Sequence, residues 1–595
     1  MKKTIIMLLV LSCIVINSQA QLKKLKAMGL GGKKSDSEAS TDTTEKTEKT
    51  KGGGNFLTKA VTKLAAASGG AIMKATGMIS TTSNLEEVTP LITFNSNLYP
   101  AELGTATQAF MKGWKSGGDM ITIMFTKKGS MGFNKIDGSV TIDGQPATYT
   151  NMGVYVAFSA QSAASRKVEI ITSTGQKSSF TLSPYNKPFK ILSINGQADN
   201  ASIDLTKDVV VEFEQAPVTE TGLLRLSLAI NQLGIKSFYD LPFIKTGKTI
   251  TIPAASFRNI NIVPGGKALY GYKNSYLSIA GEKISTTGNT SGTLPATKYD
   301  ASYSDGKLLT VVKEPILNPG VTAKGTEKFA KGDVDYTFFK PNAFLARPFN
   351  QIKKTGVSSF AIRGTTYKEG KESSTKSSFS AGGTTYTTIT TSKLIAQFPQ
   401  LSNQVWDAVL ESLYKDFIAA AQQELSTSVL PLEAVTNTDS YRAIAPFSKD
   451  DENTSVEFSR AYKNSKLLSA FMPISEGYGI NNANNKIMNQ SGANALMKFT
   501  FDLQIAIDGS YPVMVPKLAF ELVGEQNGTV AETKYCTATI IGKGSKFPEG
   551  NISAADLEKI IRKSDLVATF RKGLQELKAK EKANSDYETV WNLQK

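Results

Sequence analysis

The sequence predicts a multidomain, β-rich protein with two antiparallel β-sandwiches, then an α/β (α+β) domain with a mixed sheet, and a C-terminal helical segment. Three observations support this fold class. The chain has 595 residues, which is too many for one hydrophobic core. Short alternating segments separated by turn residues fill residues 90–285. A long amphipathic helix followed by strongly alternating strands fills much of residues 305–545.

The first twenty residues have the pattern of a secretory signal peptide. Lys2 and Lys3 precede the apolar run Ile5 to Ile16, and small residues up to Ala20 supply a cleavage site. An alternative interpretation takes Leu11-Ser12-Cys13 as a lipoprotein box, but Cys13 lies inside the apolar run. No later stretch has about 18 consecutive apolar residues, so no transmembrane span is expected. The signal predicts a periplasmic, outer-membrane-associated or cell-surface protein.

The amino-acid composition removes several classes of enzyme. The chain has no histidine, which excludes Ser-His-Asp and Cys-His catalytic sites and histidine-ligated zinc. After signal cleavage only Cys536 remains, so no intrachain disulfide can form. Cys536 lies in a strand-like run and is predicted to be a small core residue. The composition still permits carboxylate chemistry, Ser-Lys pairs and oxygen-ligated Ca²⁺ or Mg²⁺. No catalytic, cofactor-binding or metal site is predicted.

The net charge is strongly positive. Cleavage of the signal lowers the formal charge from +16 to +14, because it removes Lys2 and Lys3. For an exported protein this charge favours anionic partners such as lipid headgroups, acidic glycans or an acidic protein surface. A solvated, lysine-rich surface without such a partner explains the charge equally well. A nucleic acid partner is not expected, because no recognition motif is present.

The chain that follows the signal starts with a tether. Residues 21–55 are rich in Lys, Ser, Thr, Glu and Gly, a composition typical of a disordered basic linker. Residues 56–80 begin with a short cationic amphipathic helix, with Leu57, Val61 and Leu64 on one side. That helix either docks on a membrane surface or partner groove, or packs on its own protein.

Two β-sandwiches are predicted at 90–187 and 188–285. Short strands such as Met120 to Phe125 and Gly153 to Phe158 are separated by turns such as Asp143-Gly144. The line TKDVVVEFEQAP followed by LLRLSLAI resembles the immunoglobulin-like sandwiches strung along bacterial surface proteins. The Thr, Ser and Gly-rich residues 286–300 predict a domain boundary there.

The α/β domain is predicted at 305–545. Pro399 is expected in the first turn of a long helix that packs on a sheet and ends at Ser426, and Val429 to Val435 is expected as the next strand. Met497 to Asp508 alternates apolar and polar residues and should start an antiparallel meander. Residues 364–391, rich in Ser and Thr, are predicted to form a long loop. Residues 550–595 are predicted to be helical, with Ser553 and Asp556 forming a partial capping box.

A second resemblance covers residues 356–543. The order of strand, long helix, a Val429-Leu430-Pro431-Leu432-Glu433-Ala434-Val435 segment and a meander resembles the TolB N-terminal and CsgG-type periplasmic families. The resemblance implies a non-catalytic envelope component, often oligomeric and attached to the outer membrane. No segment was matched to the pore-forming hairpins of CsgG, so no pore is implied. The whole layout also resembles an uncharacterised exported envelope protein of Bacteroidetes-type bacteria.

Three short motifs resemble phosphate-, dinucleotide- or calcium-binding loops but lack the spacing or flanking residues of those loops. Residues 29–35 (GLGGKKS) lack the spacing of a phosphate loop and are interpreted as linker. Residues 542–545 (GKGS) lack the third glycine and following helix of a dinucleotide loop and are interpreted as a turn. Residues 449–453 (KDDEN) lack EF-hand spacing and are interpreted as an acidic solvated loop.

Three functional hypotheses follow from these observations. The first is a non-catalytic exported scaffold of the cell envelope that binds protein partners, as an accessory part of an outer-membrane assembly or as an oligomer. The second is a surface adhesion or glycan-binding protein that uses the sandwich loops. The third is a carboxylate-based hydrolase, whose paired acids come from distant strands and cannot be located by spacing.

Overall fold

The computed structural model describes residues 79–99, 117–127, 132–150, 153–232, 235–262, 272–365, 367–379, 385–398, 400–444, 447, 456–468, 482–508, 511–526, 532–548 and 550–595. The predicted signal peptide, linker and amphipathic helix therefore lie outside the described residues, apart from two residues of strand β1, and so does the acidic motif at 449–453. The protein is β-rich, with 51% strand and 21% helix, which confirms that part of the predicted fold class. It divides into two compact units, residues 1–317 with 592–595 and residues 318–591.

An eleven-stranded sheet forms most of the first unit. Its strands follow the order β1-β4-β3-β2-β19-β17-β14-β15, with β12 paired to β19, β8 to β3 and β7 to β8. The strands are β1 (Ile79–Thr82), β2 (Val88–Leu98), β3 (Gly118–Lys127), β4 (Phe133–Ile136), β7 (Thr148–Thr150), β8 (Val154–Ser159), β12 (Ala201–Asp204), β14 (Leu223–Gln232), β15 (Ile235–Lys245), β17 (Tyr272–Thr286) and β19 (Lys298–Lys313).

Two smaller sheets complete the first unit. One has the order β18-β10-β9-β5-β6 and the other β11-β13-β16. Their strands are β5 (Gly138–Ile142), β6 (Gln145–Pro146), β9 (Arg166–Thr172), β10 (Lys177–Leu182), β11 (Ile191–Ile194), β13 (Val209–Phe213), β16 (Thr249–Ile252) and β18 (Gly288–Gly292). Each small sheet contributes apolar residues to one of two separate cores, and the large sheet contributes to both.

The predicted boundary at residues 286–300 is corrected, since the two units divide after residue 317. This stretch contains β18 and the start of β19, and β19 pairs with β17 on one side and β2 on the other. The two predicted sandwiches, 90–187 and 188–285, therefore share the eleven-stranded sheet. Tyr299 and Ala301 alternate into the core beside β2. The Thr, Ser and Gly residues at 286–293, just before this alternation, gave the stretch the composition of a loop.

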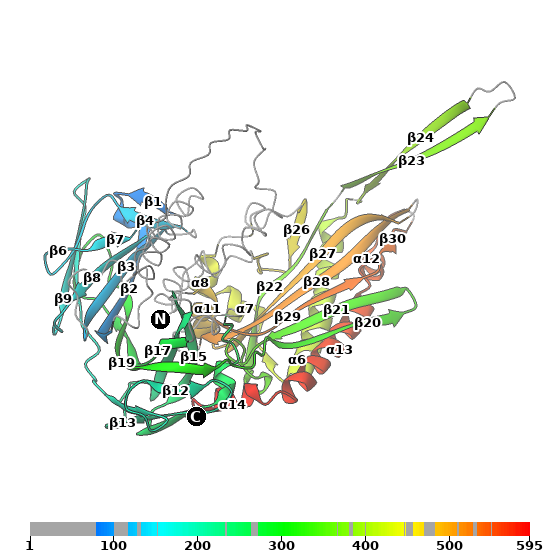
Figure 1. Ribbon diagram of the computed structural model, residues 1–595. Helices are drawn as coiled ribbons and strands as arrows, with labels where there is room; N and C mark the ends of the chain where they lie inside the picture. Colours follow the sequence, from blue (N-terminus) through cyan, green and yellow to red (C-terminus); the bar gives the residue numbers. More distant parts are fainter. Residues whose placement is uncertain are drawn as a thin grey trace. The chain divides into compact units, whose positions relative to one another are not determined.

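The second unit is built on a mixed nine-stranded sheet (Figure 1). Its main order is β20-β21-β29-β28-β27-β22-β25, with β26 paired to β22 and β30 to β28. Among the described strand pairs of this sheet, only those of β22 with β27 and β25 are parallel. The strands are β20 (Gly320–Phe329), β21 (Gly332–Pro341), β22 (Lys354–Gly364), β25 (Ser428–Val429), β26 (Phe458–Ala461), β27 (Ala495–Asp508), β28 (Tyr511–Gln526), β29 (Glu532–Gly542) and β30 (Ser545–Lys546). The predicted meander is β27-β28-β29 and is confirmed.

Helices cover one face of this sheet with a large apolar core. Helix α6 (Asn403–Leu425) packs there with α12 (Ala554–Ile561) and α13 (Lys563–Lys582), and Leu413 and Phe417 of α6 are fully buried. The prediction that this helix lies on the sheet is confirmed. Its start is corrected: Ser402 is the N-cap and accepts a hydrogen bond from the Val405 amide, while Pro399 lies outside the described residues.

Smaller helices complete the second unit. α7 (Leu432–Thr436), α8 (Asp439–Arg442) and α11 (Ala483–Ser491) enclose a small separate core. α14 (Asp586–Asn592) follows α13, so the predicted C-terminal helical segment is confirmed. Among the described helices, none is both long and apolar enough to cross a membrane.

Three expectations for this unit are corrected. Residues 429–435 form the end of β25 and helix α7, because Pro431 has no N–H to donate to a sheet and instead caps α7. The predicted loop at 364–391 contains β23 (Tyr367–Phe379) and the start of β24 (Thr385–Gln397), since its threonines favour strands. The unit begins at Asn318 rather than 305, because residues 305–313 belong to β19 of the first unit.

Candidate functional site

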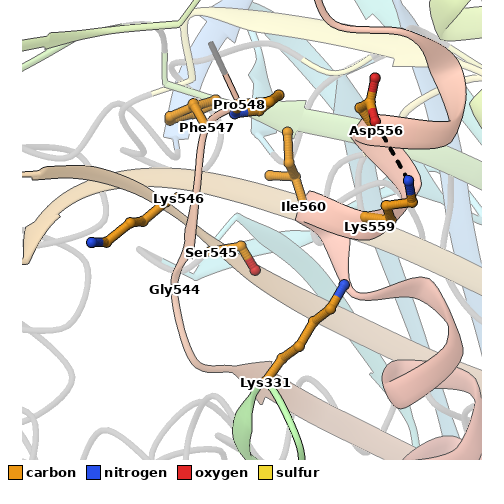
Figure 2. Close-up of a pocket in the computed structure, with 9 residues that line it drawn as sticks. All are labelled: Lys331, Gly544, Ser545, Lys546, Phe547, Pro548, Asp556, Lys559 and Ile560. Atoms are coloured by element: carbon orange, nitrogen blue, oxygen red, sulfur yellow. Dashed lines mark ion pairs between the residues drawn. The ribbon is translucent and has the colours of Figure 1, made fainter.

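A pocket of about 410 Å³ opens beside helix α12 of the second unit (Figure 2). It is lined by residues from three places in the sequence: the β20–β21 turn, the segment around β30, and α12. The lining residues are Lys331, Gly544, Ser545, Lys546, Phe547, Pro548, Asp556, Lys559 and Ile560. The lining contains three lysines and a single carboxylate, so it carries a net positive charge.

The β20–β21 turn places Lys331 at the pocket. Phe329 pairs with Gly332 across the hairpin, which leaves a loop of two residues. Gly332 has φ +101°, a conformation that side chains rarely adopt, and a Cβ there would lie 2.7 Å from the Lys543 side chain. Glycine is therefore required at this position to close the turn and hold Lys331 beside α12.

Helix α12 places Lys559 and Asp556 on one wall. The predicted capping box at its start is present and complete: Ser553 Oγ accepts from the Asp556 amide, and the Ser553 amide donates to the Asp556 carboxylate. Hydrogen bonds donated to the carboxylate by the Ser553 hydroxyl and the Ser553 amide lower the pKa of Asp556 below its ordinary value of 3.8. Lys559 Nζ lies 3.6 Å from Asp556 Oδ1, an exposed pair that holds the lysine only weakly.

Arg562 joins the walls of the pocket. It follows α12 with φ 59°, and its side chain is fully buried. Its guanidinium donates to the Gly332 carbonyl at 2.6 Å and the Asp333 carbonyl at 3.0 Å, and its Nη2 lies 2.9 Å from Asp565 Oδ2. Because the same carbonyl of Asp333 accepts from the Lys543 amide, the β20–β21 turn, the chain leading into β30 and the end of α12 are fixed together.

The lysines of the pocket differ in direction. Figure 2 shows the ammonium of Lys559 directed at Asp556 and the side chain of Lys331 extending from its turn toward α12, whereas the ammonium of Lys546 points away from both. Lys546 Nζ instead lies 3.6 Å from the centre of the Tyr511 ring. Among the described residues, no carboxylate forms an ion pair with Lys331. The opposite wall is apolar and consists of Phe547, Pro548 and Ile560.

This arrangement suits binding better than catalysis. Within the described part of the chain, no lysine hydrogen-bonds to the Ser545 hydroxyl as an activating base. No group of three or more His, Cys, Asp or Glu residues that could hold a metal ion is found in the described ranges. Two ammonium groups beside an apolar wall can hold an anion that carries an apolar body.

A second lysine centre lies inside the core. Lys340 is fully buried at the end of β21, and its ammonium lies 2.9 Å from Glu581 Oε2. It also donates to the Arg347 carbonyl at 2.5 Å and the Tyr535 carbonyl at 3.1 Å, and lies 4.1 Å from the centre of the Phe349 ring. Burial lowers the pKa of Lys340, and the Glu581 carboxylate opposes that shift. All three protons are engaged, so this lysine has a structural role.

The residues considered in the sequence analysis have varied outcomes. Cys536 is fully buried, and burial raises the pKa of its thiol to about 12, which confirms it as a core residue. Trp406 and Tyr414 pack within the core on α6. The GKGS motif at 542–545, predicted as a turn, is a short connection in which Gly542 ends β29 and Ser545 starts β30, and Gly544 and Ser545 line the pocket. The lysines of the pocket were missed, because Lys331 and Lys559 lie in other segments and no local motif links them.

A long β-hairpin is the other candidate feature. β23 and β24 pair antiparallel over thirteen residues without a bulge and form a sheet of their own. Figure 1 shows this arm extending away from the nine-stranded sheet, between the end of β22 and the start of α6. Within the described ranges no third strand pairs with it. Both of its outer edges therefore present backbone N–H and C=O groups that no described strand satisfies.

The comparisons with known proteins give no family. No family model matches the chain, and no curated protein matches it. A solved structure of a Salmonella alpha-2-macroglobulin mutant, Y1175G, is 8% identical with a TM-score of 0.12. The match covers 79% of this chain and 27% of that one, so the chain spans about a quarter of that protein's length.

Proposed function

We propose that this protein is a non-catalytic scaffold of the cell envelope that binds other proteins, and that the β23–β24 arm is its main contact element. The observation that carries the proposal is the arm itself: two thirteen-residue strands that pair only with each other among the described strands. The resemblance to TolB N-terminal and CsgG-type envelope proteins and the signal peptide pattern agree with this role.

The physical argument rests on the unpaired edges. Thirteen residues of strand extend about 43 Å, at about 3.3 Å per residue. A two-stranded hairpin of this kind is only marginally stable in water, and a third strand with a packed face is needed to stabilise it. The sequence of the two strands contains no proline, so each residue keeps its backbone donor. A strand from a partner protein can therefore add to either edge by backbone pairing.

The test is crosslinking and affinity purification from the native envelope. In one variant, a short glycine and serine linker replaces residues 366–397, which removes the arm and leaves β22 and α6 in place. We expect the intact protein to retain a stable partner and the shortened protein to lose it. The control is the unfolding transition of the second unit, which should change little, because the apolar residues described on the sheet, α6, α12 and α13 all remain in the variant.

Two results would contradict the proposal. Retention of the same partners by the shortened protein would show that the arm is not the contact element. Recovery of the intact protein in the cytoplasmic fraction would contradict the envelope location. Turnover of a substrate that depends on buried or pocket carboxylates would instead favour a hydrolase.

A further inference from the structure

We infer that the pocket beside α12 binds a carboxylate attached to an apolar body. Its cationic side would hold the carboxylate between Lys331 and Lys559, and its apolar side would cover the rest of the ligand. This inference does not rest on the proposed scaffold function, which is carried by the arm at residues 367–397. The two sites consist of different residues, so either can fail its test without the other.

The charge of the lining favours an anion. Lys331 has no ion-pair partner among the described residues, and Lys559 has only the 3.6 Å contact with Asp556. The Asp556 carboxylate is itself occupied, since its Oδ2 accepts from Ser553 Oγ at 2.6 Å. A carboxylate that enters the pocket gains two ammonium donors and competes with one weak internal pair. Charge-assisted hydrogen bonds of this kind are stronger than neutral ones.

The apolar wall restricts which anions fit. Phe547 is half-buried, and its ring contacts Phe398, 5.6 Å away between centroids, so the wall is held by the core. Ile560 is buried on α12 and Pro548 is exposed at the rim. A small hydrated anion gains nothing from these side chains. A ligand with four or more methylene groups, or a leucine side chain, would bury apolar surface against them.

The pocket is held in shape before any ligand enters. Arg562 fixes the Lys331 turn to the end of α12 through the Gly332 and Asp333 carbonyls, and the capping box fixes the other end of the helix. The two lysine-bearing elements are therefore positioned by buried hydrogen bonds rather than by the ligand. Such preorganisation lowers the entropic cost of binding.

The experiment is calorimetric titration of the full chain with four probes. They are hexanoate, acetate, inorganic phosphate, and a capped tripeptide that ends in leucine with a free carboxylate. The amide of the same tripeptide is the matched neutral control. We expect hexanoate to bind about tenfold more tightly than acetate, because it buries its methylene groups. Binding of the tripeptide acid alone would identify a peptide C-terminus, and binding of both acids would show that a small organic acid suffices.

Variants assign the binding to the pocket. Lys331→Met and Lys559→Met should each weaken binding of the acid about fivefold, because each removes one exposed ionic contact. Lys546→Met is the control and should change nothing, since that ammonium points away toward Tyr511. Asp556→Asn should strengthen binding about twofold, because it frees Lys559 and keeps an oxygen for the cap.

Several outcomes would overturn the inference. One is equal binding of the tripeptide acid and its amide, and another is binding of neither acid. Phosphate or acetate binding as tightly as hexanoate would show that the apolar wall contributes nothing. Equal effects of Lys331→Met and Lys546→Met would show that the anion sits elsewhere.

Discussion

Two lysines of one β-hairpin show opposite uses of the same side chain. Lys331 lies in the turn at the start of β21 and is exposed, whereas Lys340 lies near the end of the same strand and is fully buried. Lys340 has three polar partners, and Lys331 has no ion-pair partner among the described residues. Burying an ammonium is costly, so the core must satisfy it completely. An exposed ammonium carries no such cost and stays available to a ligand.

The largest expected effect comes from breaking the buried pair. Glu581→Gln leaves the Lys340 charge in the core without its carboxylate, and we expect a loss of about 3–5 kcal/mol in the free energy of unfolding. Urea unfolding followed by tryptophan fluorescence measures it. Trp591 is a suitable reporter, because its Nε1 donates to the Ala343 and Ala346 carbonyls a few residues from Lys340.

The control for this prediction removes both charges. Replacing Lys340 by Met in the Glu581→Gln variant should recover most of the lost stability, since no unpaired charge is then buried. A loss below about 1 kcal/mol for Glu581→Gln alone would mean that water reaches Lys340 and that it resembles Lys331 after all.

Arg562 should give the next largest effect, because it is buried like Lys340 but serves the exposed pocket. Arg562→Met removes the part-buried hydrogen bonds from a charged group to the Gly332 and Asp333 carbonyls, and we expect a loss of about 2–3 kcal/mol in the free energy of unfolding. Arg562→Lys is the informative comparison, since a single ammonium cannot bridge the Gly332 and Asp333 carbonyls as a guanidinium does. If Arg562→Lys were as stable as the native chain, the clamp would not determine the shape of the pocket.

Sequence patterns predicted the elements whose apolar residues repeat regularly. Helix α6 and strand β27 were identified because their apolar residues recur at every fourth and every second position, a pattern that is visible within one short segment. The arm and the start of β19 were missed because their Thr and Ser residues have the composition of a loop. Pairing between β2 and β19, about 200 residues apart, leaves no local signal. The sequence could indicate strands there, but not which strands share a sheet.

The pocket could not be predicted for a related reason. Lys331, Ser545 and Lys559 come from three segments that meet only through Arg562 and the sheet. The local motif at 542–545 was interpreted as a turn, and the residues that lie beside it in the fold could not be inferred from the sequence. The buried ion pair between Lys340 and Glu581 spans 241 positions and was equally hidden. What the sequence did show is that the chain has no histidine, so no histidine-based site can form.

Glu521 offers an intermediate case between the two lysines of the hairpin. It lies on the sheet between Lys534, at 3.1 Å, and Lys498, at 3.6 Å, and all three side chains are partly exposed. Burial raises the pKa of Glu521, but the two lysines outweigh this and hold it below its ordinary value of 4.5. The group therefore adds stability above about pH 4.5, and that contribution is lost as the pH falls through the lowered pKa.

The measurement compares unfolding at pH 7 and pH 3 for the native chain and Glu521→Gln. The variant should be less stable at pH 7 by under about 1 kcal/mol, and the difference should shrink at pH 3, where the native carboxylate is also protonated. A difference that is constant with pH would show that the glutamate packs rather than pairs.

The smallest effect on stability is expected for Lys331, the exposed lysine of the hairpin. Lys331→Met should change the free energy of unfolding by less than about 0.5 kcal/mol, because the side chain is exposed and lacks an ion-pair partner in the described part of the protein. Mild acetylation of the native chain, read by peptide mass spectrometry, should modify Lys331 rapidly and leave Lys340 unmodified until the unit unfolds. Equal modification of the two lysines would remove the contrast between a structural and an available ammonium. A large destabilisation by Lys331→Met would place Lys331 in the framework with Arg562, and the pocket would then be a by-product of packing.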